Sequence, residues 1–223
     1  MSLWMPVVKV PGHPDKVGYD ALGFGNKGPK RGDVKHSAEG WAAYLRFLVQ
    51  SALAIKSWHF SVLTDGTIWQ HYPVNVHCWH AGDTDDDDDV RANIELVGIE
   101  HEGLVGTPLT AEQTAATIEI TKFCAEFFER DAAYDRFPVQ PSDGWMLVEH
   151  NEVSNAFTAC PSGRIPWDDV LKGLDDMPTD EELENRAKAD AIFATAAAHV
   201  RQGRTPPKTI RDQIQWFLNA WNA

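Results

Sequence analysis

Two histidines and one cysteine are the side chains of this 223-residue chain that could together bind a metal. His36 ends a short β-prone run, His150 follows the apolar run 146–148, and Cys160 comes ten residues later, directly before Pro161. Imidazole and thiolate are good zinc ligands, and three protein ligands leave a fourth position open for water, as in catalytic zinc sites. A histidine at the end of a strand is also commonly a hydrogen-bonded structural residue. The spacing alone therefore leaves both interpretations open.

The segments around these residues predict an α/β fold with a mixed central β-sheet flanked by helices. Asp-Gly between two β-prone runs predicts a hairpin that turns at residues 64–66. A capping-box pattern at residues 110–113 predicts the start of a helix over roughly residues 111–134. Because strand ends gather reactive groups in such sheets, we expect His36 and His150 at strand ends. The other expected elements are a helix over 38–54, strands over 75–82 and 93–103, and a short helix from Trp167.

Proline, glycine and a change of composition divide the chain into three parts. Residues 1–30 contain four prolines and five glycines, which predict an extended, irregular N-terminal arm rather than a helix or a sheet. Residues 31–177 form the predicted α/β domain. Residues 178–223 are predicted to form two helices, interrupted at 203–208, and the second has one apolar face. About forty-five residues are too few for an independent domain, so we expect this C-terminal helical extension to pack on the rest.

Charge and composition exclude several classes of function. A formal net charge of −13 argues against a nucleic-acid partner and against adsorption to anionic membranes, because both require a basic surface. No apolar run approaches the length of a membrane span, and residues 1–16 lack the pattern of a signal peptide. Three cysteines without tight spacing do not predict a disulfide framework. We therefore expect a soluble protein that is synthesised in the cytoplasm and carries no export signal of its own.

Six segments bear a resemblance that goes further than these patterns. The chain resembles the zinc-dependent N-acetylmuramoyl-L-alanine amidases of the type-2 family, which include many phage endolysins, and the related peptidoglycan recognition proteins. The resemblance covers roughly residues 31–170, and the combination is more specific than any one segment. The matching segments, in the order of the family, are VKHSAEG, SWHFSVLTDGTIWQ, CWHAG, NIELVGIEHEG, PLTAEQ and EHNEVSNAFTACPS.

The resemblance implies that His36, His150 and Cys160 bind Zn²⁺. Many members have aspartate at the third position, and a cysteine thiolate is an alternative that binds zinc well. The implied reaction is hydrolysis, by zinc-activated water, of the amide between N-acetylmuramic acid and L-alanine of the stem peptide. Glu100 matches the family glutamate that faces the zinc and is the implied general base. Without the resemblance, a lone strand glutamate would be interpreted as a solvated edge charge.

Other site residues are predicted by alternation or by the same resemblance. Strand alternation places Glu102 on the same side as Glu100, where we expect it to be solvated or to face the substrate. His80 is implied to line the groove and contact the substrate, and Trp58 is placed with it as a substrate contact. The chain departs from the family at two positions. Thr158 stands where some members have a lysine that stabilises the oxyanion, so a hydroxyl replaces a charge. Trp58 stands where some members have a tyrosine.

The acidic run at residues 83–89 has two interpretations. Carboxylates suit calcium, but the run lacks the glycine and the distal glutamate of a calcium loop. We therefore interpret it as a solvated insertion. Cys78 and Cys124 lie in apolar contexts and are predicted to be buried thiols.

The favoured function is a peptidoglycan amidase, specifically a phage or prophage endolysin that acts on the cell wall after release. Its expected partner is peptidoglycan or a muropeptide, with no nucleic acid and no membrane insertion, and we expect a monomer. One alternative is a non-catalytic peptidoglycan-binding protein of the same fold, but the cysteine at position 160 favours the enzyme. Another alternative is an amidase that acts on free muropeptides in recycling.

Overall fold

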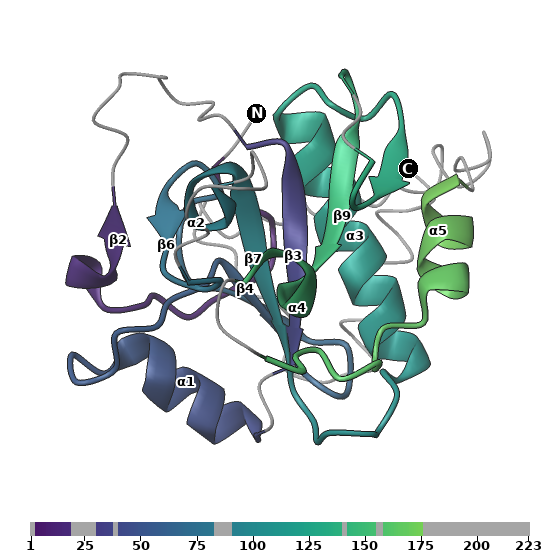
Figure 1. Cartoon of the computed structure of the whole chain (residues 1–223). Helices are drawn as coiled ribbons and strands as arrows, with labels where there is room; N and C mark the ends of the chain where they lie inside the picture. Colours follow the sequence, from purple (N-terminus) through teal and green to yellow (C-terminus); the bar gives the residue numbers. More distant parts are fainter. Residues whose placement is uncertain are drawn as a thin grey trace, which may run out of the picture. The chain divides into compact units, whose positions relative to one another are not determined.

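A seven-stranded mixed sheet forms the centre of the protein (Figure 1). The computed structural model describes residues 3–18, 30–37, 40–82, 91–139, 142–154 and 158–175. Neighbouring strands are parallel except for the antiparallel hairpin of β4 and β5, so the predicted mixed α/β sheet is confirmed. In spatial order the strands are β1 (Val8–Lys9), β5 (Ile68–Gln70), β4 (Phe60–Val62), β7 (Leu96–His101), β3 (Gly32–Ser37), β9 (Trp145–Glu149) and β8 (Tyr134–Arg136).

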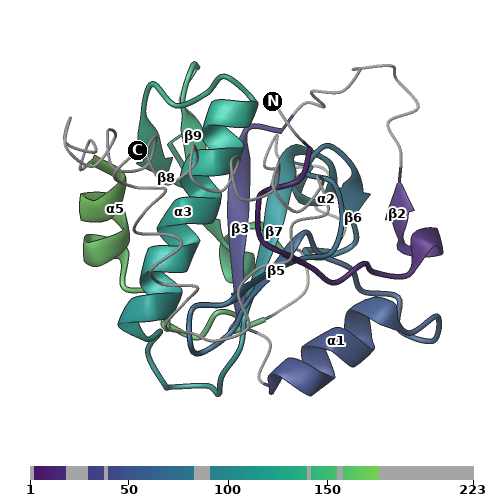
Figure 2. The same cartoon turned by 180° about the vertical axis from the view of Figure 1, so that it is seen from behind.

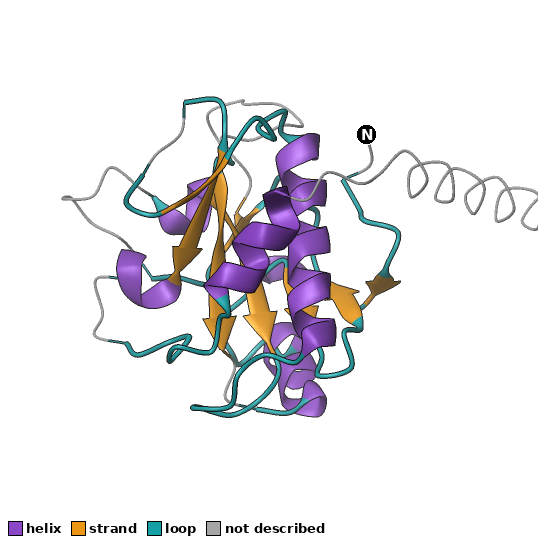
Figure 3. Cartoon of the chain, turned by 90° about the vertical axis from the view of Figure 1, so that its right-hand side faces the viewer, coloured by secondary structure: helices purple, strands orange, loops and turns teal. Residues whose placement is uncertain are grey.

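Helices cover both faces of this sheet. The helix α3 (Ala111–Phe127) packs on one face and α5 (Trp167–Asp175) packs on α3, as Figure 2 shows from behind. On the opposite face lie α4 (His150–Val153) and α2 (Ala92–Glu95), each next to a central strand. The helix α1 (Ala42–Gln50) lies beyond the hairpin side of the sheet (Figure 1). The layering of helices on the sheet is visible edge-on in Figure 3.

Side-chain alternation along the central strands fills two cores. Trp145 and Leu147 of β9 point into the core beneath α3, whereas Met146 and Val148 point into the core on the α4 side. The central strand β3 is buried at all six positions. Because both faces are covered, β9 is a nearly continuous apolar run. The buried strand β3 instead carries polar and charged side chains at most of its positions.

One hairpin turn and one helix cap were predicted correctly from local chemistry. The hairpin turns at residues 64–66, where Gly66 has a φ of +81°, a conformation that favours glycine. Thr110 caps α3 by accepting a hydrogen bond from the Gln113 backbone N–H at 3.0 Å, and the Gln113 side chain accepts one from the Thr110 N–H. The helix that begins at Trp167 is also confirmed.

The helix expected over 38–54 and the strand expected over 75–82 are shorter in the structure, as Ala42–Gln50 and His77–Cys78. Three further predictions were wrong. The helix expected over roughly 111–134 ends at Phe127, shortly before Glu129 with a φ of +58°. Residues 134–136 form β8, which pairs with β9. Residues 93–95 belong to α2 rather than to a strand, because the Asn93 side chain accepts hydrogen bonds from the backbone N–H groups of His80 and Ala81.

The third correction concerns the N-terminal arm, which does contribute to sheets. Its β1 pairs with the edge strand β5, and its β2 (Val17–Gly18) pairs with β6 (His77–Cys78) in a separate two-stranded sheet. Exposed strand edges attract such pairing, because their backbone groups otherwise lack protein partners.

Two predictions lie outside the described residues: the C-terminal helical extension at 178–223 and the acidic insertion at 83–89. Among the helices that are described, none has the length and apolar character needed to cross a bilayer. Cys78 and Cys124 are buried, as predicted.

A charged pair is buried under α3 at the centre of the sheet. Asp33 and Lys35 of β3 are both fully buried and form a salt bridge with each other. The second carboxylate oxygen of Asp33 accepts hydrogen bonds from Thr121 Oγ1 and Trp145 Nε1, both at 2.8 Å. Lys35 Nζ also donates to Thr121 Oγ1 at 2.9 Å. The network therefore connects β3 to β9 and to α3.

Removing one partner of this pair should cost more stability than removing both. Asp33→Ala leaves the Lys35 ammonium buried without its counter-charge, so we expect the free energy of unfolding to fall by about 3–5 kcal/mol. The double variant Asp33→Ala/Lys35→Met should lose less, because no unpaired charge remains. Denaturant unfolding of both variants tests this, with exposed Glu119→Ala on α3 as the control at about 0.5 kcal/mol or less. A double variant that is less stable than Asp33→Ala would contradict the expectation.

Candidate active site

The structure brings the three predicted ligands together at one edge of the sheet. His36 is near the end of β3, His150 directly follows β9 as the first residue of α4, and Cys160 lies on the loop after α4. One ligand atom from each of the three lies within 4.8 Å of the others, and the rings of His36 and His150 have centroids 4.5 Å apart. Ligand atoms around a tetrahedral zinc are about 3.5 Å apart, so a small contraction would complete such a site.

The protonation of these side chains fits a metal. Burial, followed by the neighbouring His150 and His80, lowers the pKa of His36 well below its ordinary value. Burial lowers the pKa of His150 to about 4. Both imidazoles are therefore neutral at neutral pH, which is the form that binds metal ions. The backbone N–H of Ser37 donates to Cys160 Sγ at 3.1 Å, which places the sulfur beside the end of β3.

Neighbouring groups fix the backbone of each ligand. His101 points away from the site, and its Nδ1 donates to the His36 carbonyl oxygen at 2.8 Å. The N–H of Asn151 donates to the Cys160 carbonyl oxygen at 2.9 Å. Arg164, buried behind the cysteine loop, donates to Ser37 Oγ at 2.8 Å and to the Glu102 carbonyl oxygen at 2.9 Å. Cys160 is therefore tied to α4 through Asn151 and to the end of β3 through Ser37.

Glu100 faces the ligand cluster from the neighbouring strand. The register of β3 and β7 pairs Glu100 directly with His36, and both line the same cavity of about 240 Å³. Burial raises the pKa of Glu100 to about 8, against the opposing effects of Lys56 and Arg164. A carboxyl group with a pKa near neutrality is well suited both to accept and to return a proton.

His80 packs against the ligands, as expected for a residue of the groove. Its Nδ1 lies 3.1 Å from His36 Nε2, a hydrogen bond that orients the ligand ring. The ring of His80 lies directly on Gly98 of β7, where an added Cβ would come within 2.7 Å of it. Any larger residue at position 98 would displace His80, so the glycine of the Gly-Ile-Glu segment is required by this close approach.

Thr158 and Trp58 also line the site. Thr158 lines the cavity and accepts a hydrogen bond from the Cys160 N–H at 3.2 Å, so its hydroxyl proton remains available to another acceptor. Trp58 lines the same cavity but is 2% exposed, and its Nε1 donates to Ser61 Oγ at 2.8 Å. Its predicted role as a substrate contact is therefore limited to a small part of the ring.

The hydrogen bonds of Glu102 favour a positioning role over the predicted contact with the substrate. One carboxylate oxygen accepts a hydrogen bond from the Ala42 N–H at 2.8 Å, at the first residue of α1. The other accepts from the Thr64 N–H at 2.9 Å, in the turn of the hairpin. Trp41, the residue before α1, makes no capping side-chain hydrogen bond, so Glu102, which directly follows β7, supplies that cap. We therefore assign Glu102 to positioning and no longer propose it as a substrate contact.

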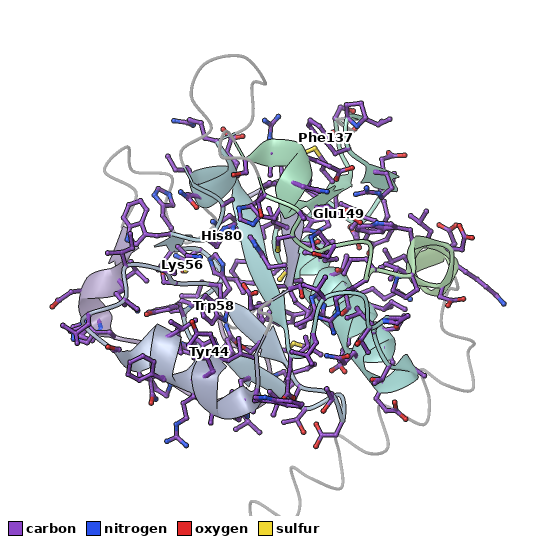
Figure 4. The ribbon with its side chains drawn as sticks, turned by 60° about the horizontal axis from the view of Figure 1, so that its bottom comes forward. Tyr44, Lys56, Trp58, His80, Phe137 and Glu149 are labelled. Carbon is purple, nitrogen blue, oxygen red and sulfur yellow. The ribbon has the colours of Figure 1, made fainter. Side chains whose placement is uncertain are left out.

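Sequence reasoning missed three residues of the site: Arg164, Tyr44 and Lys56. Tyr44 of α1 and Lys56, which follows α1, line the small cavity with Trp58 and His80, and Figure 4 shows these four side chains between α1 and the sheet. A second cavity of about 770 Å³ shares Lys56 and His80 with the first. Arg164 follows Cys160 by four residues, but Tyr44 and Lys56 lie in segments without any motif, so their proximity is a product of the fold.

A two-histidine, one-cysteine cluster opposite a buried glutamate, at the edge of a mixed α/β sheet, is typical of a metal-dependent hydrolase. A family model described as N-acetylmuramoyl-L-alanine amidase matches residues 27–163. The chain therefore belongs to the N-acetylmuramoyl-L-alanine amidase family. No curated protein sequence matches it.

Solved structures of amidases share the fold at low sequence identity. An AmpD derivative superposes with a TM-score of 0.61 at 17% identity, covering 78% of this chain and 97% of its own. The endolysin amidase LysCS from Clostridium intestinale gives 0.51 at 19% identity, covering 78% of this chain and 99% of its own. Drosophila PGRP-LB, solved in complex with tracheal cytotoxin, gives 0.51 at 17% identity, covering 73% of this chain and 91% of its own. These likenesses establish the fold.

Truncating Glu102 tests its positioning role. Glu102→Ala removes the hydrogen bonds that the carboxylate accepts from the Ala42 N–H, the Thr64 N–H and Thr64 Oγ1, so we expect the free energy of unfolding to fall by about 1.5–3 kcal/mol, the range for bonds to a charged group. Amide exchange should increase at Ala42 and Thr64, while metal content stays unchanged. A variant with normal stability and a raised KM would instead support the substrate contact predicted from the sequence.

Proposed function

We propose that this chain hydrolyses the amide between the lactyl group of N-acetylmuramic acid and L-alanine of the stem peptide, as a zinc enzyme. The observation that carries the proposal is the convergence of His36, His150 and Cys160 in one cavity opposite Glu100. Membership of the amidase family supports the choice of bond. The donor set of two imidazoles and a thiolate supports the choice of zinc.

Each residue of the cavity has a place in this reaction. His36, His150 and Cys160 would hold the zinc, which when bound polarises the carbonyl and lowers the pKa of water. Glu100 takes the proton from the attacking water and returns it to the leaving amine of L-alanine. The Thr158 hydroxyl donates a hydrogen bond toward the carbonyl oxygen. His80 keeps His36 oriented and forms part of the wall next to the substrate.

The biological setting is also part of the proposal. We place the protein as a phage or prophage endolysin that is synthesised in the cytoplasm and degrades the wall after release, acting as a monomer. The structural likeness to an endolysin amidase is consistent with this setting. The cysteine at position 160 favours an enzyme over a non-catalytic binding protein, because it completes the set of ligands.

Digestion of purified peptidoglycan tests which bond is cut. We expect new L-alanine amines, counted by amine labelling, without new reducing sugar ends. Chelation should stop the release, and added zinc should restore it, because the proposed reaction requires zinc bound by the three ligands. His36→Ala should lack both zinc and activity. New reducing ends without new amines would show that a glycosidic bond is cut and that the proposed bond is wrong.

Changing Glu100 separates the base from the ligands. Glu100→Gln keeps the shape of the side chain and leaves the three ligands intact, so zinc content measured by mass spectrometry should stay near one per chain. The initial rate on a soluble muropeptide should fall by about a hundredfold to ten-thousandfold, the range for loss of general acid–base catalysis. Glu112→Gln, an exposed change at the start of α3, serves as the control. A zinc-replete Glu100 variant with the normal rate would place the base elsewhere.

A further inference from the structure

The small cavity has one ammonium or guanidinium group among its lining residues, Lys56. Attack on an amide places negative charge on the carbonyl oxygen, and a site gains most when a positive group already faces that oxygen. The Thr158 hydroxyl brings no charge. Arg164 lies behind the cysteine loop, where its guanidinium donates to Ser37 Oγ and to backbone carbonyls. Among the residues that the structure describes, Lys56 is therefore the candidate for this charge.

The position of Lys56 suits contact with the reacting group. It lines both cavities, together with His80, His150 and Thr158, and so lies at their junction next to a ligand. Its backbone is well fixed, because the Ser57 N–H donates to the Trp79 carbonyl oxygen at 3.1 Å and Ser57 Oγ donates to the Lys16 carbonyl oxygen at 2.6 Å. A long side chain on a fixed backbone can reach a bound substrate without rearrangement of the loop.

The Lys56 ammonium is not committed to another partner. The structure shows neither a salt bridge nor a hydrogen bond to its Nζ from the described residues, although the chain as a whole carries 33 acidic residues. Lys56 lines the small cavity together with Glu100, His150 and Cys160. Its charge therefore belongs to the cavity that contains the three predicted ligands.

We propose that the Lys56 ammonium contacts the scissile carbonyl oxygen and stabilises its negative charge in the transition state. The inference rests on the proposed amidase reaction and assigns to Lys56 the positive charge that Thr158 does not supply. A different role, binding a carboxylate of the stem peptide, would also use a lysine in the groove. The two roles differ in when the contact forms, since an oxyanion exists only in the transition state whereas a carboxylate is present on the bound substrate.

The test compares Lys56→Met, which keeps the length of the side chain but not its charge, with Lys56→Arg, which keeps the charge. The matched control is Lys172→Met, an exposed lysine of α5 that lines neither cavity. Each variant is assayed on N-acetylmuramoyl-L-alanyl-D-glutamate with the glutamate carboxylates free or amidated. Zinc content is measured for each variant. Equilibrium affinity for the uncleaved substrate is measured with each change placed in the Glu100→Gln background.

We expect Lys56→Met to lower kcat by about a hundredfold on both substrates, as loss of one oxyanion donor does. The KM, the zinc content and the affinity for uncleaved substrate should stay within about twofold, because ground-state binding is not affected. Lys56→Arg should recover part of the rate, and Lys172→Met should match the unmodified enzyme.

Three results would overturn the inference. An unchanged kcat in Lys56→Met would show that the ammonium does not act in the reaction. Weakened affinity confined to the substrate with free carboxylates would assign Lys56 to the stem peptide instead. A loss of zinc would indicate a structural role. If the unmodified enzyme releases no L-alanine amine, the proposed function itself fails, and the inference falls with it.

Discussion

The buried pair of Asp33 and Lys35 is the interaction on which the rest of the structure depends. It lies on β3, the strand with β7 on one side and β9 on the other, and through Thr121 and Trp145 it fixes that strand against α3 and β9. The next residue along β3 is His36, which points to the opposite face by alternation. The register that satisfies the charges on one face therefore determines where the ligand stands on the other. A shift of the β3 register by one residue would place His36 under α3. It would also bury the charged pair against the apolar core on the opposite face of the sheet.

The site uses this fixed strand as its reference. His36 of β3 is paired with Glu100 of β7, and His150 directly follows the end of β9. Arg164 donates a hydrogen bond to Ser37 from behind the cysteine loop. His36, Glu100 and His150 thus lie in a strand or helix, and Cys160 is hydrogen-bonded to the end of β3. Such a site needs little reorganisation during a reaction, because its dipoles are held in place before the substrate arrives. Glu102 contributes in the same way, by tying α1 and the hairpin to β7 rather than by meeting the substrate.

The sequence predicted what local chemistry determines. The central strands, the turn at residues 64–66 and the cap of α3 depend on neighbours in the chain, and the three ligands were recognised because motifs surround them. The errors came from contacts that local patterns do not contain. Residues 93–95 are helical because the Asn93 side chain accepts a hydrogen bond from the backbone N–H of His80. The strand β1 forms because it pairs with the otherwise unpaired edge of β5. Glu102 was placed on the correct face by alternation, but alternation does not reveal that backbone N–H groups from two other elements occupy its carboxylate. Tyr44 reaches the cavity through the packing of α1, and Lys56 through the contacts of Ser57 with Trp79 and Lys16.

The three cysteines differ in a way that matters for redox chemistry. Cys78 and Cys124 are buried in apolar cores, and burial raises the pKa of both thiols, which keeps them protonated and unreactive. Cys160 is only partly buried and faces the cavity. Oxidants and electrophiles attack accessible thiolates, so such reagents act on this chain at a ligand and spare its core. A family member with aspartate at the same position has no such sensitivity. In the proposed zinc enzyme, a sulfur ligand at position 160 would therefore link activity to the oxidation state of the surroundings, whereas an oxygen ligand would not.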